Sequence, residues 1–180
     1  MSFREKNPVQ TLLYRLGQVC QQLGFVSPLS AAELQEVEER LSPAALRLFV
    51  SMSPADQRHS LRVCRALQTL GWREEDILTA ALLHDVGKAA GRVPFWTRPA
   101  IVLGKRCAPH LLTRLAVYPI KQPGLPRWRR ALSYAWWHAE VGSDLVAEVG
   151  LSARVAHYIR MHHRPDSPEL AALHLVDEVS

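Results

Sequence analysis

The segment from Asp76 to Lys88, DILTAALLHDVGK, is apolar on nearly every side if it forms a helix. A helix that is hydrophobic all round has to be surrounded by other elements, because it has no face suited to water. We therefore expect this segment to be the central helix of the fold, with other helices packed on several sides. The same segment carries His84 and Asp85, a histidine and an acid side by side within the apolar run.

The rest of the chain shows helical spacing with clear start signals. Ser30-Ala-Ala-Glu33 has the form of a capping box, and the pairs Ser42-Pro43 and Ser53-Pro54 each place a cap residue before a proline at the first helical position. No two segments show the alternation and tight turn of a β-hairpin. The expected fold is all-α. Apart from the central segment, helices are expected at about 12–23, 30–41, 53–70, 110–117, 129–137, 139–149, 152–163 and 170–179.

Length and composition indicate one ordinary soluble domain. The chain has 180 residues, of which 48% are hydrophobic and 22% charged, a balance that lets it bury a core. No apolar run approaches the ~20 residues of a membrane span, and the start, MSFREKNPVQ, shows no secretory signal. Cys20, Cys64 and Cys107 lie far apart without a CxxC motif, so we expect buried, reduced thiols. These features favour a cytoplasmic protein.

Positive charge is concentrated in one block of the chain. The net charge is +5, but no acid lies between Asp85 and Glu140, and that stretch holds ten of the 22 basic residues together with seven aromatic ones. Such a block attracts phosphate-rich ligands. As partner we favour a phosphate-bearing small molecule over nucleic acid or an acidic membrane surface at residues 88–130. A solvated basic face, with its aromatic residues in the core, is the remaining alternative.

The polar atoms of His84 and Asp85 need a partner if the central helix is buried. An ionised aspartate buried without one costs several kcal/mol or more, and a divalent metal would satisfy both side chains at once. Consecutive helical residues point ~100° apart, so both reach one ion only near a helix end, for which Gly87 is the expected place. A hydrogen-bonded pair without metal is the alternative. Further candidate ligands are His59, His138, His162, His163 and Asp177.

The order of these residues resembles the HD superfamily of metal-dependent phosphohydrolases over residues 53–180. The segments that carry the resemblance are His84-Asp85-Val86-Gly87-Lys88, His-Ser-Leu-Arg-Val from His59, His-Ala-Glu-x-Gly from His138, the pair His162-His163, and Leu-x-Leu-x-Asp-Glu around Asp177. The first of them is similar to the HD-Ile-Gly motif of one branch. Where cyclic-dinucleotide phosphodiesterases have Gly-Tyr-Pro, residues 164–168 read Arg-Pro-Asp-Ser-Pro, which argues against that substrate.

The resemblance implies a domain division and a role for each site residue. We expect an N-terminal helical extension at 1–52 and an HD-domain helical bundle at 53–180, with a basic, aromatic-rich insert at about 89–133. The implied ligands of a first metal are His59, His84, Asp85 and Asp177, with Asp85 able to bridge to a second. His138 and His162 would bind the second metal or contact substrate phosphate, and His163 is a secondary candidate. The implied catalytic residues are Asp85 and Lys88, the latter reaching a phosphate oxygen.

The implied function is phosphoester hydrolysis by metal-activated water, with a nucleotide or a related small molecule as substrate. Nitrogen and oxygen ligands without cysteine suit one or two ions of Fe, Mn, Co, Ni or Zn, with Mg as a further choice. The alternative is a non-catalytic HD module that binds a nucleotide or nucleic acid as a sensor or interaction domain. Every expected ligand position is filled, which favours the enzyme, because a degenerate module usually lacks a ligand.

Overall fold

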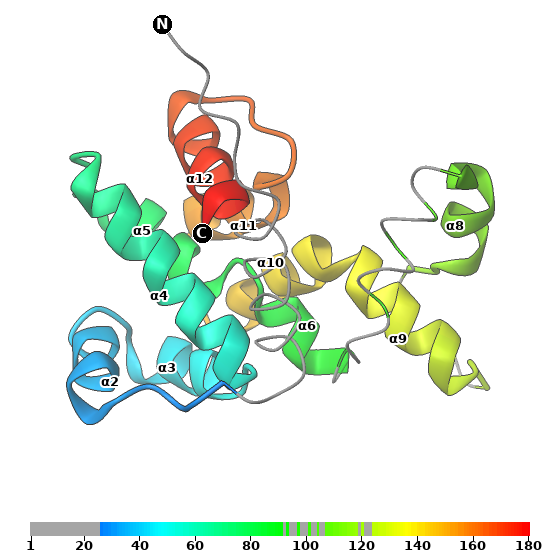
Figure 1. Ribbon diagram of the computed structural model, residues 1–180, viewed down its shortest axis with the longest axis horizontal. Helices are drawn as coiled ribbons and strands as arrows, with labels where there is room; N and C mark the ends of the chain where they lie inside the picture. Colours follow the sequence, from blue (N-terminus) through cyan, green and yellow to red (C-terminus); the bar gives the residue numbers. More distant parts are fainter. Residues whose placement is uncertain are drawn as a thin grey trace, which may run out of the picture.

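The ordered elements are all helices in this computed structural model, which describes residues 26–91, 93, 97, 101, 104, 107–118, 120 and 124–180 (Figure 1). No strand occurs in that part of the chain, so the expected all-α fold is confirmed. The helix expected at 12–23 lies outside the described residues. The helices are α2 (Ala31–Glu38), α3 (Pro43–Val50), α4 (Pro54–Thr69), α5 (Glu75–Leu83), α6 (Val86–Gly91), α8 (Pro109–Leu115), α9 (Arg127–Trp136), α10 (His138–Glu148), α11 (Ala153–Met161) and α12 (Pro168–Val179).

The helix starts follow from local capping, as the sequence predicts. The Ser30 amide donates to the Glu33 carboxylate at 2.8 Å, and the Glu33 amide donates to Ser30 Oγ at 3.3 Å, which completes the capping box of α2. Ser42 and Ser53 cap α3 and α4 by accepting amide hydrogen bonds in the first turn. These bonds satisfy amides that would otherwise have no partner, so each start is fixed within four residues of sequence.

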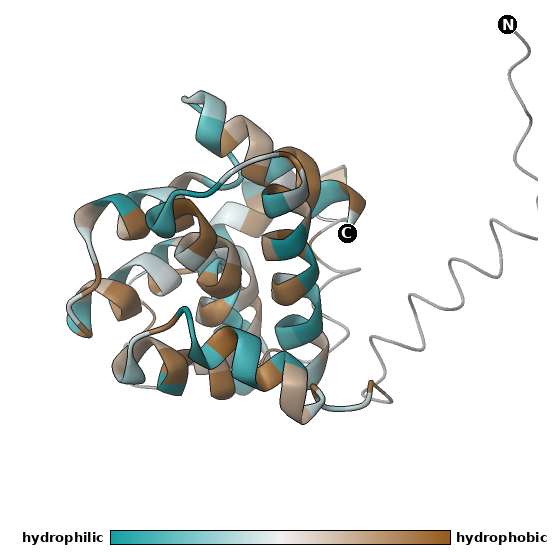
Figure 2. Ribbon diagram, turned by 90° about the vertical axis from the view of Figure 1, so that its left-hand side faces the viewer, coloured by the Kyte–Doolittle hydropathy of each residue, from teal (hydrophilic) through white to brown (hydrophobic). Residues whose placement is uncertain are grey.

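Helix α5 is the centre of the bundle. All of its residues from Ile77 to Leu83 are buried except Thr79, and the helix packs against α4 and α11 as well as α3 and α12. Its apolar side chains share one core with Val37 of α2 and Phe49 of α3. The expectation of a central, enclosed helix is confirmed. In a second view, hydrophobic and hydrophilic residues alternate along the outer helices, as amphipathic packing requires (Figure 2).

Helix α5 ends earlier than its apolar run suggests. The helix stops at Leu83, a turn contains His84 and Asp85, and α6 begins at Val86. The expected end at Gly87 is therefore wrong, since Gly87 lies inside α6. A Cβ atom at Gly87 would lie 2.0 Å from the carbonyl oxygen of His138, so the glycine is what lets α6 pack closely on α10. His84 itself keeps helical backbone angles, with φ −57° and ψ −30°, so the break between α5 and α6 is short.

Two boundaries near the carboxyl end also differ from the expected ones. Helix α11 ends at Met161, before the histidine pair, and α12 begins at Pro168. The last helix begins two residues earlier than expected, because Pro168 occupies the first helical position behind Ser167, whose Oγ accepts the Leu170 amide at 3.3 Å.

Two cysteines differ in their surroundings. Cys64 is buried, as expected, and burial raises the pKa of its thiol to about 11. Cys107 is exposed, so the expectation of a buried thiol is wrong there, while Cys20 lies outside the described residues.

Helices α8 and α9 lie to one side of the bundle (Figure 1). Helix α9 packs on α6, and α8 packs on α9, while α10 lies against α6 and α11. None of the described helices is both long and apolar enough to cross a membrane.

Candidate metal centre

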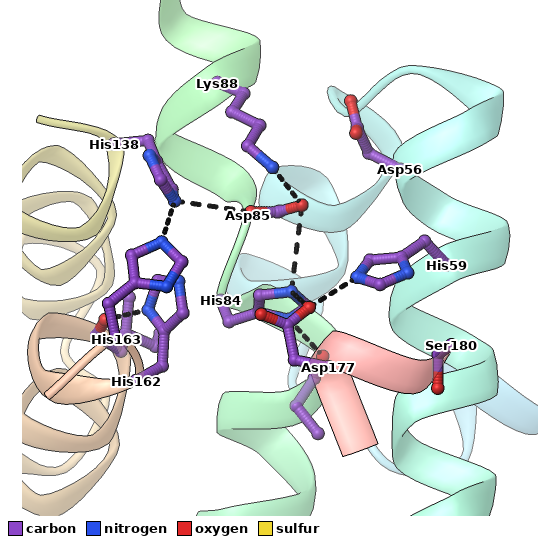
Figure 3. Close-up of polar contacts among 12 residues, drawn as sticks. Asp56, His59, His84, Asp85, Lys88, His138, His162, His163, Asp177 and Ser180 are labelled. Carbon is purple, nitrogen blue, oxygen red and sulfur yellow. Dashed lines mark hydrogen bonds and ion pairs between the residues drawn. The ribbon is translucent and has the colours of Figure 1, made fainter. Parts of the chain in front are cut away.

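Histidine and aspartate side chains from five parts of the chain converge on one point in the bundle (Figure 3). The bundle brings together residues far apart in sequence, so that Nε2 of His59 on α4 lies 2.8 Å from Oδ1 of Asp177 on α12. The converging residues are His59 on α4, His84 and Asp85 between α5 and α6, His138 at the start of α10, His162 and His163 after α11, and Asp177 on α12.

A first group of potential ligand atoms surrounds Asp177. Its Oδ1 lies 2.8 Å from Nε2 of His59 and 3.3 Å from Nε2 of His84. The ligand atoms of His59, His84 and Asp85 lie within 4.8 Å of one another. The four residues expected at the first metal are therefore gathered at distances that one ion can span after small side-chain adjustments.

A second group consists of three histidines. The ligand atoms of His138, His162 and His163 also lie within 4.8 Å of one another, and Nε2 of His163 is 3.1 Å from Nε2 of His138. Two nitrogens bound to one ion at about 2.1 Å lie about 3.4 Å apart in tetrahedral geometry. His163, a secondary candidate on the sequence, thus lies as close to His138 as a shared ion would require.

The Asp85 carboxylate lies between the two groups. Its Oδ2 is 3.7 Å from Nε2 of His84, and its Oδ1 is 3.6 Å from Nε2 of His138. The Lys88 amine donates to Oδ2 at 2.5 Å. One oxygen of this buried carboxylate therefore faces each group, the arrangement that a bridging ligand needs.

Three of the histidines are held in the same way, each by a carbonyl three residues earlier in the chain. A carbonyl only accepts, so in each ring Nδ1 carries the proton and Nε2 faces the site, the orientation typical of metal-binding histidines. Each carbonyl belongs to the last turn of a helix, where it has no intrahelical partner. The distances are 2.9 Å from His84 to Ala81, 2.9 Å from His138 to Ala135 and 2.6 Å from His162 to Ile159.

Two of the inward-facing nitrogens have no hydrogen bond. Nε2 of His84 and Nε2 of His162 are buried, and neither has a hydrogen-bond partner among the described residues. A buried polar atom without any partner costs about 1–3 kcal/mol, and at His84 the Asp177 carboxylate 3.3 Å away offsets part of that cost. The donor set fits a divalent transition metal, which would satisfy both atoms.

The carboxylates of the site stay ionised in spite of their burial. Burial raises the pKa of Asp85, but the charges of Lys88, His84 and His138 outweigh it and hold the pKa well below its usual range. Burial is likewise outweighed at Asp177, where the hydrogen bond with His59 and the nearby His84 ring lower the pKa. Anionic oxygens are therefore present at neutral pH on the side of the first group.

His84 differs in charge from His138 and His162. Burial opposes protonation of His84, yet the neighbouring Asp85 and Asp177 raise its pKa to about 9. Burial and the Lys88 charge lower the pKa of His138 to about 3, and burial with the nearby His84 charge lowers that of His162. His138 and His162 thus offer neutral imidazoles, the form that binds metal.

A cavity of about 620 Å³ opens beside the second group. Of the candidate residues, Lys88, His138 and His163 line it, together with Arg160, Met161 and Arg164, which sequence reasoning did not single out. The sequence offered a reason to consider Arg164, because this residue directly follows the histidine pair. It offered no such reason for Arg160, because the position of its side chain depends on how α11 packs on α10.

Other histidine, arginine and tryptophan side chains lie away from the site or support it indirectly. His174 donates from Nδ1 to the His162 carbonyl at 3.0 Å, so it braces the backbone of a candidate ligand. Arg127, Trp128 and Arg130 are exposed on α9. None of the three is among the residues that line the cavity. Arg129 donates to two α8 carbonyls, those of Leu115 at 2.8 Å and Arg114 at 3.0 Å.

Comparison with known proteins agrees with this geometry. Residues 57–99 match the family model of the HD domain, a stretch that contains His59, His84, Asp85 and Lys88. Searches of curated proteins and of solved structures gave no match. HD domains are generally found in metal-dependent phosphohydrolases. The match identifies an HD-domain segment at residues 57–99, and the helical bundle and the histidine–aspartate cluster are consistent with an HD superfamily domain.

Proposed function

We propose that the chain is a metal-dependent phosphohydrolase that cleaves a phosphoester of a nucleotide or a related small molecule. The observation that carries this proposal is the anchoring of His84, His138 and His162 through Nδ1, which turns three Nε2 atoms toward the two groups of potential ligand atoms. Asp85 and Asp177 bring carboxylate oxygens to the same place, and a cavity of ligand size adjoins it.

The candidate ligands form two sets, one for each of two possible ions. His59, His84, Asp85 and Asp177 would hold the first ion, and His138, His162 and His163 the second, with Asp85 shared. Nitrogen and oxygen donors without a thiolate suit Fe, Mn, Co, Ni or Zn. A bound ion supplies charge stabilisation to phosphoryl oxygens and makes water acidic enough to act as a nucleophile near neutral pH.

Lys88 and Asp85 provide the remaining functions at the reacting end. The Lys88 amine both lines the cavity and donates to Asp85, so it is placed to donate to a phosphate oxygen of a ligand in the cavity. Its charge also keeps Asp85 ionised and helps keep His138 neutral. Because Asp85 is only 3% exposed, bulk water does not screen these interactions.

Metal content and hydrolysis together test the proposal. Protein purified without chelator should contain about one to two equivalents of transition metal, and His84→Ala and Asp85→Ala should lose them together with hydrolysis. The matched control is His157→Ala, an exposed histidine on α11 that should keep both. The substrates are mono-, di- and dinucleotide phosphates, with phosphate release as the readout. Metal-free wild-type protein would refute the proposal, and metal-loaded protein that cuts none of them would indicate a binding module.

A further inference from the structure

The cavity meets the metal centre on one side only. His138 and His163 line it, whereas His59, His84 and Asp177 are not among its lining residues. Its walls come from Lys88 on α6, from the junction of α9 and α10, and from the carboxyl end of α11 with the residues after it. A volume of about 620 Å³ is within the range of small-molecule sites. A ligand whose phosphate reaches Lys88 and His163 therefore extends its other end along α9–α10 and α11.

The walls of the cavity are largely apolar between its charged residues. Trp136 and Trp137 lie at the α9–α10 junction, with Met161 from α11 and Ile101 also in the lining. Trp137 is fixed by a hydrogen bond from Nε1 to the Ala116 carbonyl at 3.1 Å and by contact with the Tyr118 ring, 5.7 Å away between centroids. Such walls favour a flat, apolar body such as a ring.

Two arginines line the cavity in addition to Lys88. Arg160 is held in place by α10, because its Nη2 donates to Asp144 at 3.0 Å and its Nε donates to Ser143 at 3.3 Å. Asp144 in turn accepts a hydrogen bond from the Tyr118 hydroxyl. Nη1 of Arg160 makes no hydrogen bond to the described residues, which leaves two donors for a ligand.

Arg164 adds a second cation at the same place. It directly follows His163, its side chain is exposed, and no ion pair joins it to an acid in the described part of the chain. Among the described residues that line the cavity, Glu140 is the one acid and Lys88, Arg160 and Arg164 are the cations. Two guanidinium groups suit a phosphate, whose oxygens accept several charge-assisted hydrogen bonds, better than they suit a neutral group.

We propose that the cavity holds a second phosphate subsite formed by Arg160 and Arg164, so that the preferred substrate carries two phosphate groups separated by a ring or similar apolar body. One phosphate reacts beside Lys88 and His163, and the body of the substrate lies against Trp136 and Trp137. This inference rests on the proposed phosphohydrolase function for the identity of the reacting end. The second subsite itself is a claim about binding, so binding alone can test it.

Uncleavable probes separate the two ends of the site. Isothermal titration calorimetry of the metal-loaded full chain would compare benzylphosphonate, which has a ring and one anionic group, with p-xylylenebisphosphonate and its biphenyl homologue, which have two. We expect at least one bisphosphonate to bind about tenfold or more tightly than benzylphosphonate. The ratio of the two affinities should approach one in Arg160→Gln and in Arg164→Gln.

The control is Arg154→Gln on the same helix, because Arg154 pairs with Glu74 and is absent from the cavity lining. It should keep the wild-type affinity ratio. The subsite would be overturned if neither bisphosphonate bound more tightly than benzylphosphonate. It would also be overturned if the preference for a bisphosphonate persisted after both arginines were replaced. An arginine-dependent preference in a protein that hydrolyses no phosphoester would keep the subsite and reject the proposed function.

Discussion

The metal centre and the basic flank of this molecule use charge in opposite ways. We define the basic flank as the exposed residues Leu111, Arg114, Arg127, Trp128 and Arg130 of α8 and α9. In the centre, Asp85 is nearly enclosed and each of its oxygens faces a histidine, so neighbouring charges shift pKa values strongly. The flank arginines have no ion pair to any described residue. The degree of burial, and not the number of charges, decides how strongly a charged group shifts the pKa values of its neighbours.

The same contrast exists within the cationic stretch itself. Arg129 lies between Arg127 and Arg130 in the chain, yet it is turned inward and bonds the carbonyls at the end of α8. Lys88, at the start of the stretch, belongs to the metal centre. The basic residues between Asp85 and Glu140 therefore occupy different environments and do not form one surface.

Metal removal should give the largest effect and should separate the two regions. A site that holds a metal at 100 to 1,000 times its dissociation constant gains about 3–4 kcal/mol of folding free energy. Chelation should therefore lower the Tm of the wild-type protein by several degrees in differential scanning calorimetry. Arg127→Gln/Arg130→Gln should show the same drop, because the flank is not needed for metal binding, whereas His84→Ala should show none. An equal drop in His84→Ala would mean that the metal binds elsewhere.

Gly87→Ala should be the next most damaging change. Its Cβ would lie 2.0 Å from the His138 carbonyl oxygen, so α6 and α10 must separate. Overpacking of this kind costs about 1–3 kcal/mol, and we expect the upper end together with reduced metal content. Urea unfolding and elemental analysis provide the measurements. Gly142→Ala is a milder comparison, because its nearest contact, Cγ2 of Ile159, would be 3.1 Å away. Full stability in Gly87→Ala would contradict the close packing described here.

Arg129→Ala should be less costly but should still stand out from its neighbours. It removes two hydrogen bonds from a cation to the last carbonyls of α8, worth about 1–2 kcal/mol together. Arg127→Ala, at an exposed position on the same helix, should stay within about 0.5 kcal/mol of wild type. The free energy of unfolding from urea titrations would show the difference. Equal values for the two variants would remove the distinction between inward and outward cations.

Neutralising the flank should have the smallest effect. Arg127→Gln/Arg130→Gln should weaken the binding of inorganic phosphate or a nucleotide only a few-fold at low salt. The loss should shrink further at 0.5 M salt, because exposed charges act through a screened field. Titrations at two salt concentrations measure it. A large loss that persists at high salt would place the flank in direct contact with the ligand, and unchanged affinity at low salt would make it a purely solvated face.

Much of this could be predicted from short segments of sequence. The caps at Ser30, Ser42 and Ser53 depend on residues within four positions, and their helices start where the sequence indicates. The histidines and aspartates were likewise predictable as a set, because their order along the chain resembles the HD superfamily and because His84 and Asp85 interrupt an apolar run. Their roles as ligands stay predictions.

Features that depend on packing between distant helices could not be predicted in the same way. The apolar run through His84 shows no break, so the end of α5 was expected four residues late at Gly87. The clash that explains this glycine involves His138, which is 51 positions away in the chain. Arg160 looks like any helical arginine until α10 supplies Asp144 and Ser143.

Three imidazoles are hydrogen-bonded to carbonyls in the final turns of α5, α9 and α11. The orientation of each ring is therefore set within a local segment of four residues. The bodies of those helices can then change in length or composition during evolution, provided that the terminal turn and its ring stay together. Proteins with such segments would keep the orientation of the three rings even when the sequences of the surrounding helices diverge extensively.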